Sequence, residues 1–148
     1  MVRDVVLDGD YAYLAAGMGG LRIIDVAQSG SLAEVGSQET PGFAYAVVKA
    51  GNYAYPATTQ ALTVYGVADL TVPNPVSYFL GYTADVVVAE KLAYLFQEST
   101  LWIVDISEPL SPTQVGALSF PLHPQGYVRR NARLVVRENH AYIFNSKL

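Results

Sequence analysis

The segment "LWIVDISEPLSPTQVG" (residues 101–116) decides the fold class. Its apolar run fills consecutive positions up to Asp105, so an extended chain would carry apolar side chains on both sides. Such a strand needs cover on both faces, whereas a strand with one wet face alternates apolar and polar residues. After Asp105, Pro109 and Pro112 mark a turn, and a further short strand ends at Gly116. The segment therefore predicts two strands and a turn inside a stack of sheets.

An internal repeat extends this pattern over the whole chain. An Ala-Tyr pair recurs at spacings of 42, 39 and 48 residues. The segments around it that align without a gap are "DVVLDGDYAY" (4–13), "AVVKAGNYAY" (46–55), "DVVVAEKLAY" (85–94) and "RLVVRENHAY" (133–142). A second motif follows the first three as "LRIIDV" (21–26), "LTVYGV" (62–67) and "LWIVDI" (101–106). The opening segment is therefore one of three copies.

Each period contains four expected strands. Asp8-Gly9 and Gly51-Asn52 mark tight hairpins between the first two strands of copies one and two. The third strand is the "LRIIDV" type, and the fourth is a short strand that ends in Gly36, Gly81 or Gly116. No stretch has the spacing of an amphipathic helix. The pattern predicts antiparallel β-structure throughout.

Two aspartates at the same repeat position, Asp25 and Asp105, are expected to be structural turn residues. An aspartate that ends an apolar strand before a turn accepts hydrogen bonds from the backbone of that turn. The alternative is a pair of catalytic carboxylates or metal ligands. Recurrence at the repeat period favours the structural role, and copy two has Gly66 at this position.

Four-stranded antiparallel sheets that repeat about every 40 residues and stack face to face are typical of β-propeller blades. The sequence predicts an all-β, propeller-type array of about three and a half blades in one partial domain (1–148), cut from a larger closed propeller. The blade repeats cover 4–45, 46–84, 85–132 and an incomplete 133–148. A β-sandwich is the main rival, but it does not require four strands per period in the same order. Pro56 removes a ladder donor, so copy two is expected to be locally irregular.

The motifs of copies one and three, "LRIIDVAQSGSLAEVG" and "LWIVDISEPLSPTQVG", with the turn at 40–42 and "GNYAY" (51–55), resemble the LVIVD repeat. The resemblance covers essentially the whole chain and implies a β-propeller, often on bacterial or archaeal secreted or cell-surface proteins. Localisation to a cell surface or outside the cell rests on this resemblance alone. The absence of cysteine excludes a disulfide framework but leaves the compartment open.

The charge distribution limits the partners. The net charge of −4 argues against nucleic acid, which requires a basic footprint. No apolar run approaches the length of a membrane helix, so we expect no membrane insertion. Residues 1–120 carry four basic and twelve acidic residues, whereas residues 121–148 carry five basic residues and one acidic residue. A solvated basic loop explains this asymmetry, and an anionic ligand or head-to-tail electrostatic pairing is the alternative.

Candidate chemistry is sparse, and we expect no catalytic residue, metal or cofactor. Asp8 and Asp10 flank a glycine but lack the remaining ligands of a calcium loop. "GMGG" (17–20) precedes a strand and not the helix that a dinucleotide site needs. His123 and His140 are too few for a histidine-rich zinc site, and His140 is expected to be a packing residue.

The segment "FPLHPQGYVRRNAR" (120–133) lies outside the repeat, and insertions of this kind fall in loops, often on a binding face. Its His123, Tyr127, Arg129 and Arg130 are the candidate ligand-binding residues for a carboxylate, phosphate or sugar, with arginine as a bidentate donor. The alternative is a surface connection without a ligand.

The expected function is a non-catalytic interaction scaffold of a surface or secreted protein that binds protein or polysaccharide. The alternative is part of a propeller enzyme, a lyase or hydrolase, with an incomplete active site in this chain. Unfinished terminal blades would each leave an apolar face uncovered. We therefore expect self-association, with two copies completing a ring of about seven blades.

Overall fold

The computed structural model describes residues 1–28, 30–81, 83, 85–97, 99–120, 132–138 and 140–145. This part of the chain is all β-structure with connecting turns. It contains no helix, so these residues include no helix that is long and apolar enough to cross a bilayer.

The strands form four sheets in sequence order, each an antiparallel meander. Blade one contains β1 (Asp4–Asp8), β2 (Tyr11–Ala15), β3 (Leu21–Asp25) and β4 (Ala33–Gln38). Blade two contains β5 (Ala44–Ala50), β6 (Tyr53–Thr58), β7 (Ala61–Gly66) and β8 (Asn74–Leu80). Blade three contains β9 (Asp85–Ala89), β10 (Leu92–Gln97), β11 (Thr100–Asp105) and β12 (Thr113–Ser119). Blade four has β13 (Ala132–Arg137) and β14 (His140–Asn145). The all-β blade array predicted from the repeat is confirmed.

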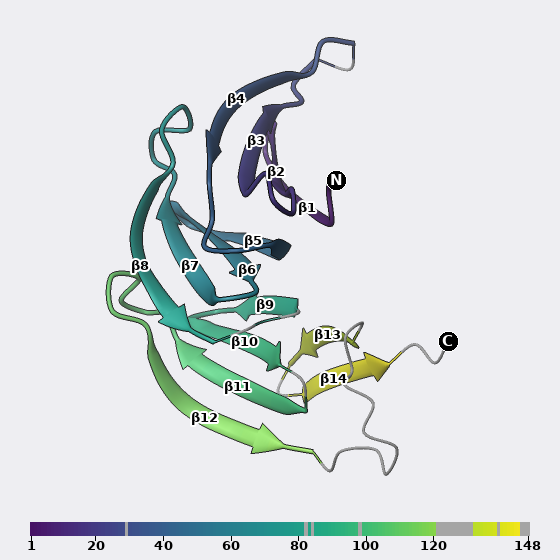
Figure 1. Cartoon of the computed structure of the whole chain (residues 1–148), viewed down its shortest axis with the longest axis vertical. Helices are drawn as coiled ribbons and strands as arrows, with labels where there is room; N and C mark the ends of the chain where they lie inside the picture. Colours follow the sequence, from purple (N-terminus) through teal and green to yellow (C-terminus); the bar gives the residue numbers. More distant parts are fainter. Residues whose placement is uncertain are drawn as a thin grey trace.

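The blades fan out around their first strands (Figure 1). Contacts between blades join β1 to β5, β5 to β9 and β9 to β13, so the first strands form the inner layer of the array. Strands β4, β8 and β12 lie on the outside of the resulting arc, and the arc is open on the side of β1 and blade four (Figure 1). We call the side of a blade that faces the next blade in sequence its front face and the opposite side its back face.

Apolar residues fill every junction between blades. Tyr13 and Ile23 of blade one pack with Tyr65 of blade two in one core cluster. Tyr55 and Val64 of blade two pack with residues of blade three in a second cluster, and a third joins blade three to blade four. Because blade two is covered on both sides, β7 buries consecutive side chains from Ala61 to Tyr65. This double burial explains the non-alternating apolar runs of the third strands.

Two carboxylates on the inner strands also tie neighbouring blades together. Asp4 accepts a hydrogen bond from the Val47 backbone N–H at 3.1 Å, and Asp85 accepts one from the Leu134 backbone N–H at 2.8 Å. Both aspartates stand at the first position of the repeat. Blade two has Ala46 there, and the Val86 backbone N–H instead donates to Asp85 of its own strand at 3.0 Å. A bond across the junction thus forms where the repeat supplies an aspartate.

The inner hairpins all turn through a residue of positive φ. The first residue of the connecting pair has φ of 59° at Gly9, 53° at Gly51, 56° at Glu90 and 52° at Glu138. Positive φ at this position is typical of tight hairpin turns, and glycine adopts it without steric cost. Copies one and two therefore have the favourable glycine at this position, whereas copies three and four have glutamate.

The prediction that Gly36 and Gly116 end their strands is wrong, because β4 and β12 continue beyond them. Both glycines lie beside a register shift in the ladder to the third strand. A Cβ on Gly36 would lie 1.8 Å from the Leu70 carbonyl oxygen of blade two, so glycine is needed for close approach of the next blade. Only Gly81 follows its strand directly, with a φ of 141°.

Pro56 lies within β6, which continues through it as one strand. The ladder to β7 pairs Ala54 with Tyr65 and Ala57 with Leu62, and no pair is formed at Tyr55 or Pro56. Proline lacks the N–H that this ladder would use. The sequence-based expectation of a local irregularity in blade two agrees with this gap.

The hairpin geometry predicts that Gly51→Ala lowers the free energy of unfolding by about 1–2 kcal/mol, because an L side chain is strained at positive φ. A Cβ at Gly51 would meet nothing within 4 Å, so backbone strain alone produces the loss. Gly66→Ala is the control, since its Cβ would meet only an ordinary contact with Val76 at 3.6 Å and it is not among the glycines of positive φ. Urea denaturation should show a change within about 0.5 kcal/mol for the control. Equal losses in both variants would contradict this account of the turn.

The close approach at Gly36 predicts that Gly36→Ala lowers the free energy of unfolding by about 1–3 kcal/mol, because blade two must shift away from β4. Gly116→Ala at the equivalent position of blade three should change it by less than about 0.5 kcal/mol. Its nearest neighbour would be the Ile103 Cδ1 at 3.4 Å, an ordinary contact. Thermal and urea unfolding of the two variants test the difference, and equal stabilities would refute it.

A candidate binding groove between the first two blades

The four residues proposed from the sequence as ligand-binding, His123, Tyr127, Arg129 and Arg130, lie outside the described residues. That site remains a prediction. The described part of the chain has no group of three or more histidine, aspartate or glutamate side chains close enough together to hold a metal ion.

The repeat aspartates Asp25 and Asp105 close the turns after their strands. Asp25 accepts a hydrogen bond from the Ala27 backbone N–H at 2.9 Å, and Asp105 accepts one from the Ser107 backbone N–H at 2.7 Å. The bond from the Ser107 backbone lowers the pKa of the Asp105 carboxyl. These are the contacts expected of an aspartate at the start of a turn.

Blade two obtains the same turn from a residue that the motif alignment misses. Asp69, three positions after Gly66, accepts hydrogen bonds from the Thr71 hydroxyl at 2.7 Å and from its backbone N–H at 2.9 Å. The bond from the Thr71 hydroxyl is the main cause of the lowered pKa of the Asp69 carboxyl. The longer segment between Leu62 and Gly81 is the sequence signal that could have revealed this displaced turn.

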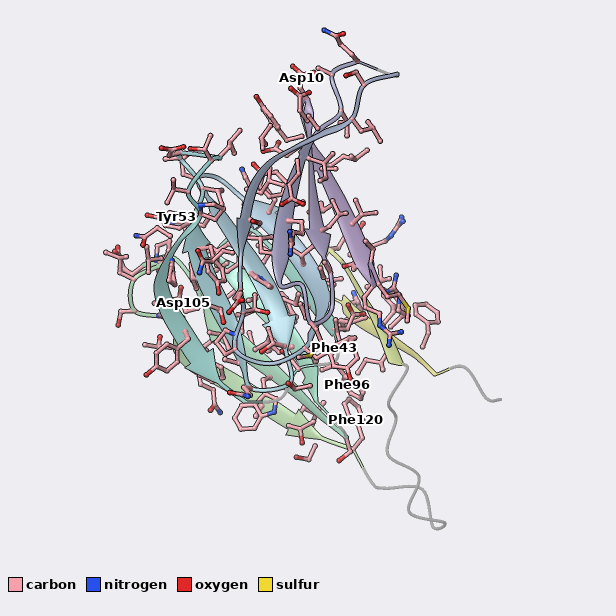
Figure 2. The ribbon with its side chains drawn as sticks, turned by 45° about the horizontal axis from the view of Figure 1, so that its top comes forward. Asp10, Phe43, Tyr53, Phe96, Asp105 and Phe120 are labelled. Atoms are coloured by element: carbon pink, nitrogen blue, oxygen red, sulfur yellow. The ribbon has the colours of Figure 1, made fainter. Side chains whose placement is uncertain are left out.

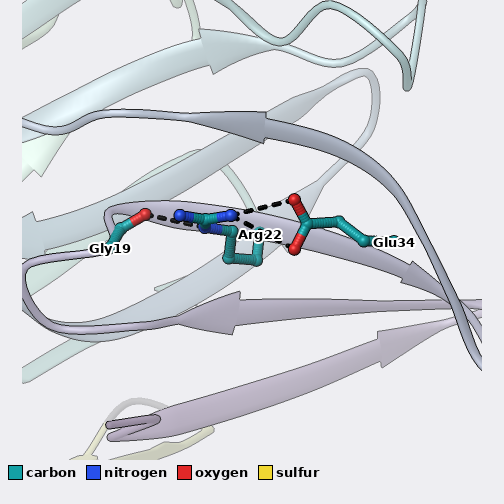
Figure 3. A network of polar contacts seen from close by, with 3 residues as sticks. All are labelled: Gly19, Arg22 and Glu34. Carbon is teal, nitrogen blue, oxygen red and sulfur yellow. Dashed lines mark hydrogen bonds and ion pairs between the residues drawn. The ribbon is translucent and has the colours of Figure 1, made fainter.

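Two ion pairs engage further carboxylates. Arg22 bridges both oxygens of Glu34, at 2.9 and 3.2 Å, and its Nε donates to the Gly19 carbonyl at 2.9 Å (Figure 3). Lys49 lies 2.8 Å from Asp8 across the first junction. Both pairs are partly exposed, so they orient side chains more than they stabilise the fold.

The two ends of the array differ in chemistry. Asp10, Tyr53 and Asp105 lie toward one end, and Phe43, Phe96 and Phe120 lie toward the other (Figure 2). At the aromatic end, Phe96 and Phe120 have ring centroids 6.3 Å apart, and the Arg3 guanidinium lies 5.1 Å from the Phe43 ring centroid.

An open groove of about 510 Å³ lies at the outer part of the first junction. Its walls are the connection from β4 to β5 (residues 39–41), Thr63 and Tyr65 of β7, and residues 75–78 of β8. It therefore lies between the segment that leaves blade one and the two outer strands of blade two. A volume of this size is in the range of ligand sites.

The groove arises from one small residue at a variable repeat position. Arg22, Thr63 and Trp102 are equivalent in the three copies of the third-strand motif. Trp102 packs against the core between blades two and three and makes an edge contact with Phe79, with centroids 6.4 Å apart. Threonine is much smaller than tryptophan, so the equivalent space at the first junction stays open.

Polar groups lie along this groove. The Thr63 hydroxyl is buried and has no hydrogen-bond partner among the described residues. The Tyr65 hydroxyl donates to the Glu39 carbonyl at 2.8 Å, and burial raises the pKa of Tyr65 to about 12. Tyr78 stands opposite Thr63 in the ladder and is 63% exposed. The groove walls thus include Glu39, Thr63 and the exposed residue Tyr78.

Blades of four antiparallel strands in series define a repeat protein of the β-propeller type. The family model of the LVIVD repeat matches residues 1–40 and 80–119, which together are more than half of the chain. The chain belongs to the LVIVD repeat family. The matched ranges omit most of the second copy, in which Gly66 and Pro56 depart from the motif.

Among solved structures, the chain is similar to two computationally designed proteins. The designed Ika8 protein aligns with a TM-score of 0.67 and 10% identity over 97% of this chain and 42% of the Ika8 chain. The designed Ika4 protein aligns with a TM-score of 0.66 and 10% identity over 98% of this chain and 91% of the Ika4 chain. The chain therefore spans less than half the length of Ika8 and most of Ika4. No curated protein matches the chain.

The buried Asp85 predicts a pH dependence of stability. Desolvation raises the pKa of its carboxyl above the ordinary value, against the opposing effects of the Leu134 hydrogen bond and Arg133. The folded chain therefore holds this proton at higher pH than the unfolded chain does. The stability that the group contributes is present below its unfolded pKa and is lost as pH rises through its folded pKa.

Urea denaturation of the wild type and Asp85→Asn from about pH 4 to about pH 7 tests this prediction, since asparagine does not titrate. The unfolding free energy of the wild type should fall relative to the variant as pH rises. The lowered pKa values of Asp69 and Asp105 make the free energy of unfolding rise with pH, but they do so equally in the wild type and in Asp85→Asn. A difference that grows in favour of the wild type with rising pH would contradict the assignment.

Proposed function

We propose that the chain is a non-catalytic binding module and that the groove between its first two blades holds an extended, basic segment of a partner protein. The observation that carries the proposal is the open groove of about 510 Å³ beside the outer strands of blade two, with Thr63, Tyr65 and Tyr78 in its walls. Grooves of this size between packed elements are typical of binding sites.

The framework around the groove is suited to recognition. The strands on either side are held by the apolar core of the first junction and by the hydrogen bond that the Val47 backbone N–H donates to Asp4. A wall built on packed strands loses little conformational entropy when a ligand binds. Ordering of the groove walls would therefore subtract little from the binding free energy of a ligand.

The groove chemistry favours a peptide segment. Pro41, Pro75 and Tyr78 supply rigid apolar surface, and tyrosine is enriched among the residues that dominate protein interfaces. Aromatic-lined grooves receive extended peptides in several peptide-recognition domains.

The charge of the surroundings favours a basic segment. Glu39 lines the groove, and residues 1–120 carry eight more acidic than basic residues. An excess of negative charge attracts cationic partners and raises their association rate. An exposed tyrosine ring also offers a face to a lysine or arginine side chain.

An array of unstructured peptides that vary in charge and proline content tests the proposal. Basic peptides should be retained, and Thr63→Trp should weaken their binding about tenfold or more by filling the groove as Trp102 does in blade three. Tyr78→Ser and Glu39→Gln should also weaken it. Circular dichroism checks that the variants remain folded.

Val115→Ser and Glu108→Gln are the matched controls, because both residues are exposed on blade three and lie outside the groove. They should bind as the wild type does. Retention of acidic peptides, equal binding by the groove variants, or groove-dependent binding of neutral oligosaccharides in place of peptides would each overturn the proposal.

A further inference from the structure

The two terminal blades carry complementary halves of one further junction. At the second repeat position, Val47, Val86 and Leu134 are 2%, 3% and 4% exposed, because each packs on the preceding blade. Val5 occupies this position in blade one and is 55% exposed. Leu7 on the same back face is also exposed. The back face of blade one thus has the residues of an inner junction without the blade that would cover them.

The front face of blade four has the matching half. The repeat tyrosines Tyr13 and Tyr55 are each 2% exposed, and they pack toward the following blade. Tyr142 occupies this position in blade four and is 48% exposed. Val135, opposite Tyr142 in the ladder, and Phe144 on the same face are exposed as well.

Charges at the inner strands agree with this pairing. Arg133 takes the first repeat position in blade four, where blades one and three have Asp4 and Asp85. Arg133 is close enough to Asp85 of the neighbouring blade to lower the pKa of that carboxyl. If blade one docked on blade four, the first repeat positions of the new junction would be Arg133 and Asp4, which have opposite charges as Asp85 and Arg133 do.

We propose that the front face of blade four in one copy docks on the back face of blade one in a second copy, and that the reciprocal contact closes a two-copy ring. The new junction repeats the packing already present between blades, with Val5 of one copy against Tyr142 of the other. A head-to-tail contact closes into a ring when the curvature allows it. The arc of blades opens on the side that carries both faces (Figure 1). This inference does not depend on a ligand in the groove.

The polar pair on blade one does not oppose docking. Arg22 and Glu34 lie on the back face at the position where Thr63 lines the groove of the first junction. The outer part of the first junction is an open groove, so at the same place in the new junction the ion pair would keep its contact with water. A fully buried pair would instead carry a desolvation cost.

Sedimentation equilibrium of the full chain tests the proposal. The wild type should have twice the 16.0 kDa mass of one chain. Val5→Asp and Tyr142→Asp should each be monomeric, because an unpaired carboxylate would be buried in the junction. Val72→Asp is the control at an exposed valine of the β7–β8 connection and should remain a dimer. Circular dichroism should show the same strand content in all four proteins.

A mixture of the two monomeric variants distinguishes head-to-tail docking from pairing of like faces. Val5→Asp keeps an intact blade four face, and Tyr142→Asp keeps an intact blade one face, so the mixture retains one complete junction and should associate. A monomeric wild type, a dimer that persists in either face variant, loss of the dimer in Val72→Asp, or a mixture that stays monomeric would overturn the proposal.

Discussion

Burial of both faces of each sheet is the constraint on which the structure depends. The third strands are apolar at successive positions, so a blade with water on one side exposes side chains that belong in a core. Blade two shows the satisfied state, with its strands buried between blades one and three. Blades one and four show the unsatisfied state, in which the same repeat positions are exposed at Val5 and Tyr142. The difference between these positions comes from neighbours and not from residue type.

Apolar packing alone would let neighbouring blades slide, and short polar and steric contacts define their relative position. The carboxylates of Asp4 and Asp85 reach across junctions to a backbone N–H at a defined place. Gly36 admits the Leu70 carbonyl of the next blade, where any larger residue would collide. The directional hydrogen bond and the close contact each allow one arrangement, whereas apolar burial is non-directional.

Variation at a repeat position turns a packed junction into a potential site. Arg22, Thr63 and Trp102 occupy one position in three copies and leave a charged surface, a groove and a filled core respectively. The surrounding strands need not change, because the ladder and the inner core hold them. A repeat scaffold of this kind can place a binding groove at one junction and close the equivalent space at the next.

Much of the fold was predictable from local sequence signals. Strand order, the inner hairpins, the blade period and the irregularity near Pro56 follow from apolar runs, turn residues and the missing proline N–H, which act within a few residues. Asp69 shows where such reasoning ends, because a turn residue displaced from the motif was missed. The glycines at 36 and 116 were expected to end strands, but both strands continue. At Gly36 the residues alone do not reveal the Leu70 carbonyl that approaches from blade two.

The groove could not be predicted, since it depends on the distance between residues 39–41 and β7 and β8 after the blades have packed. The sequence by itself determined the four-stranded unit and its repetition. Only the tertiary structure decided which faces are covered, which carboxylates reach the next blade and where a small side chain leaves space, because these properties depend on the contacts between blades.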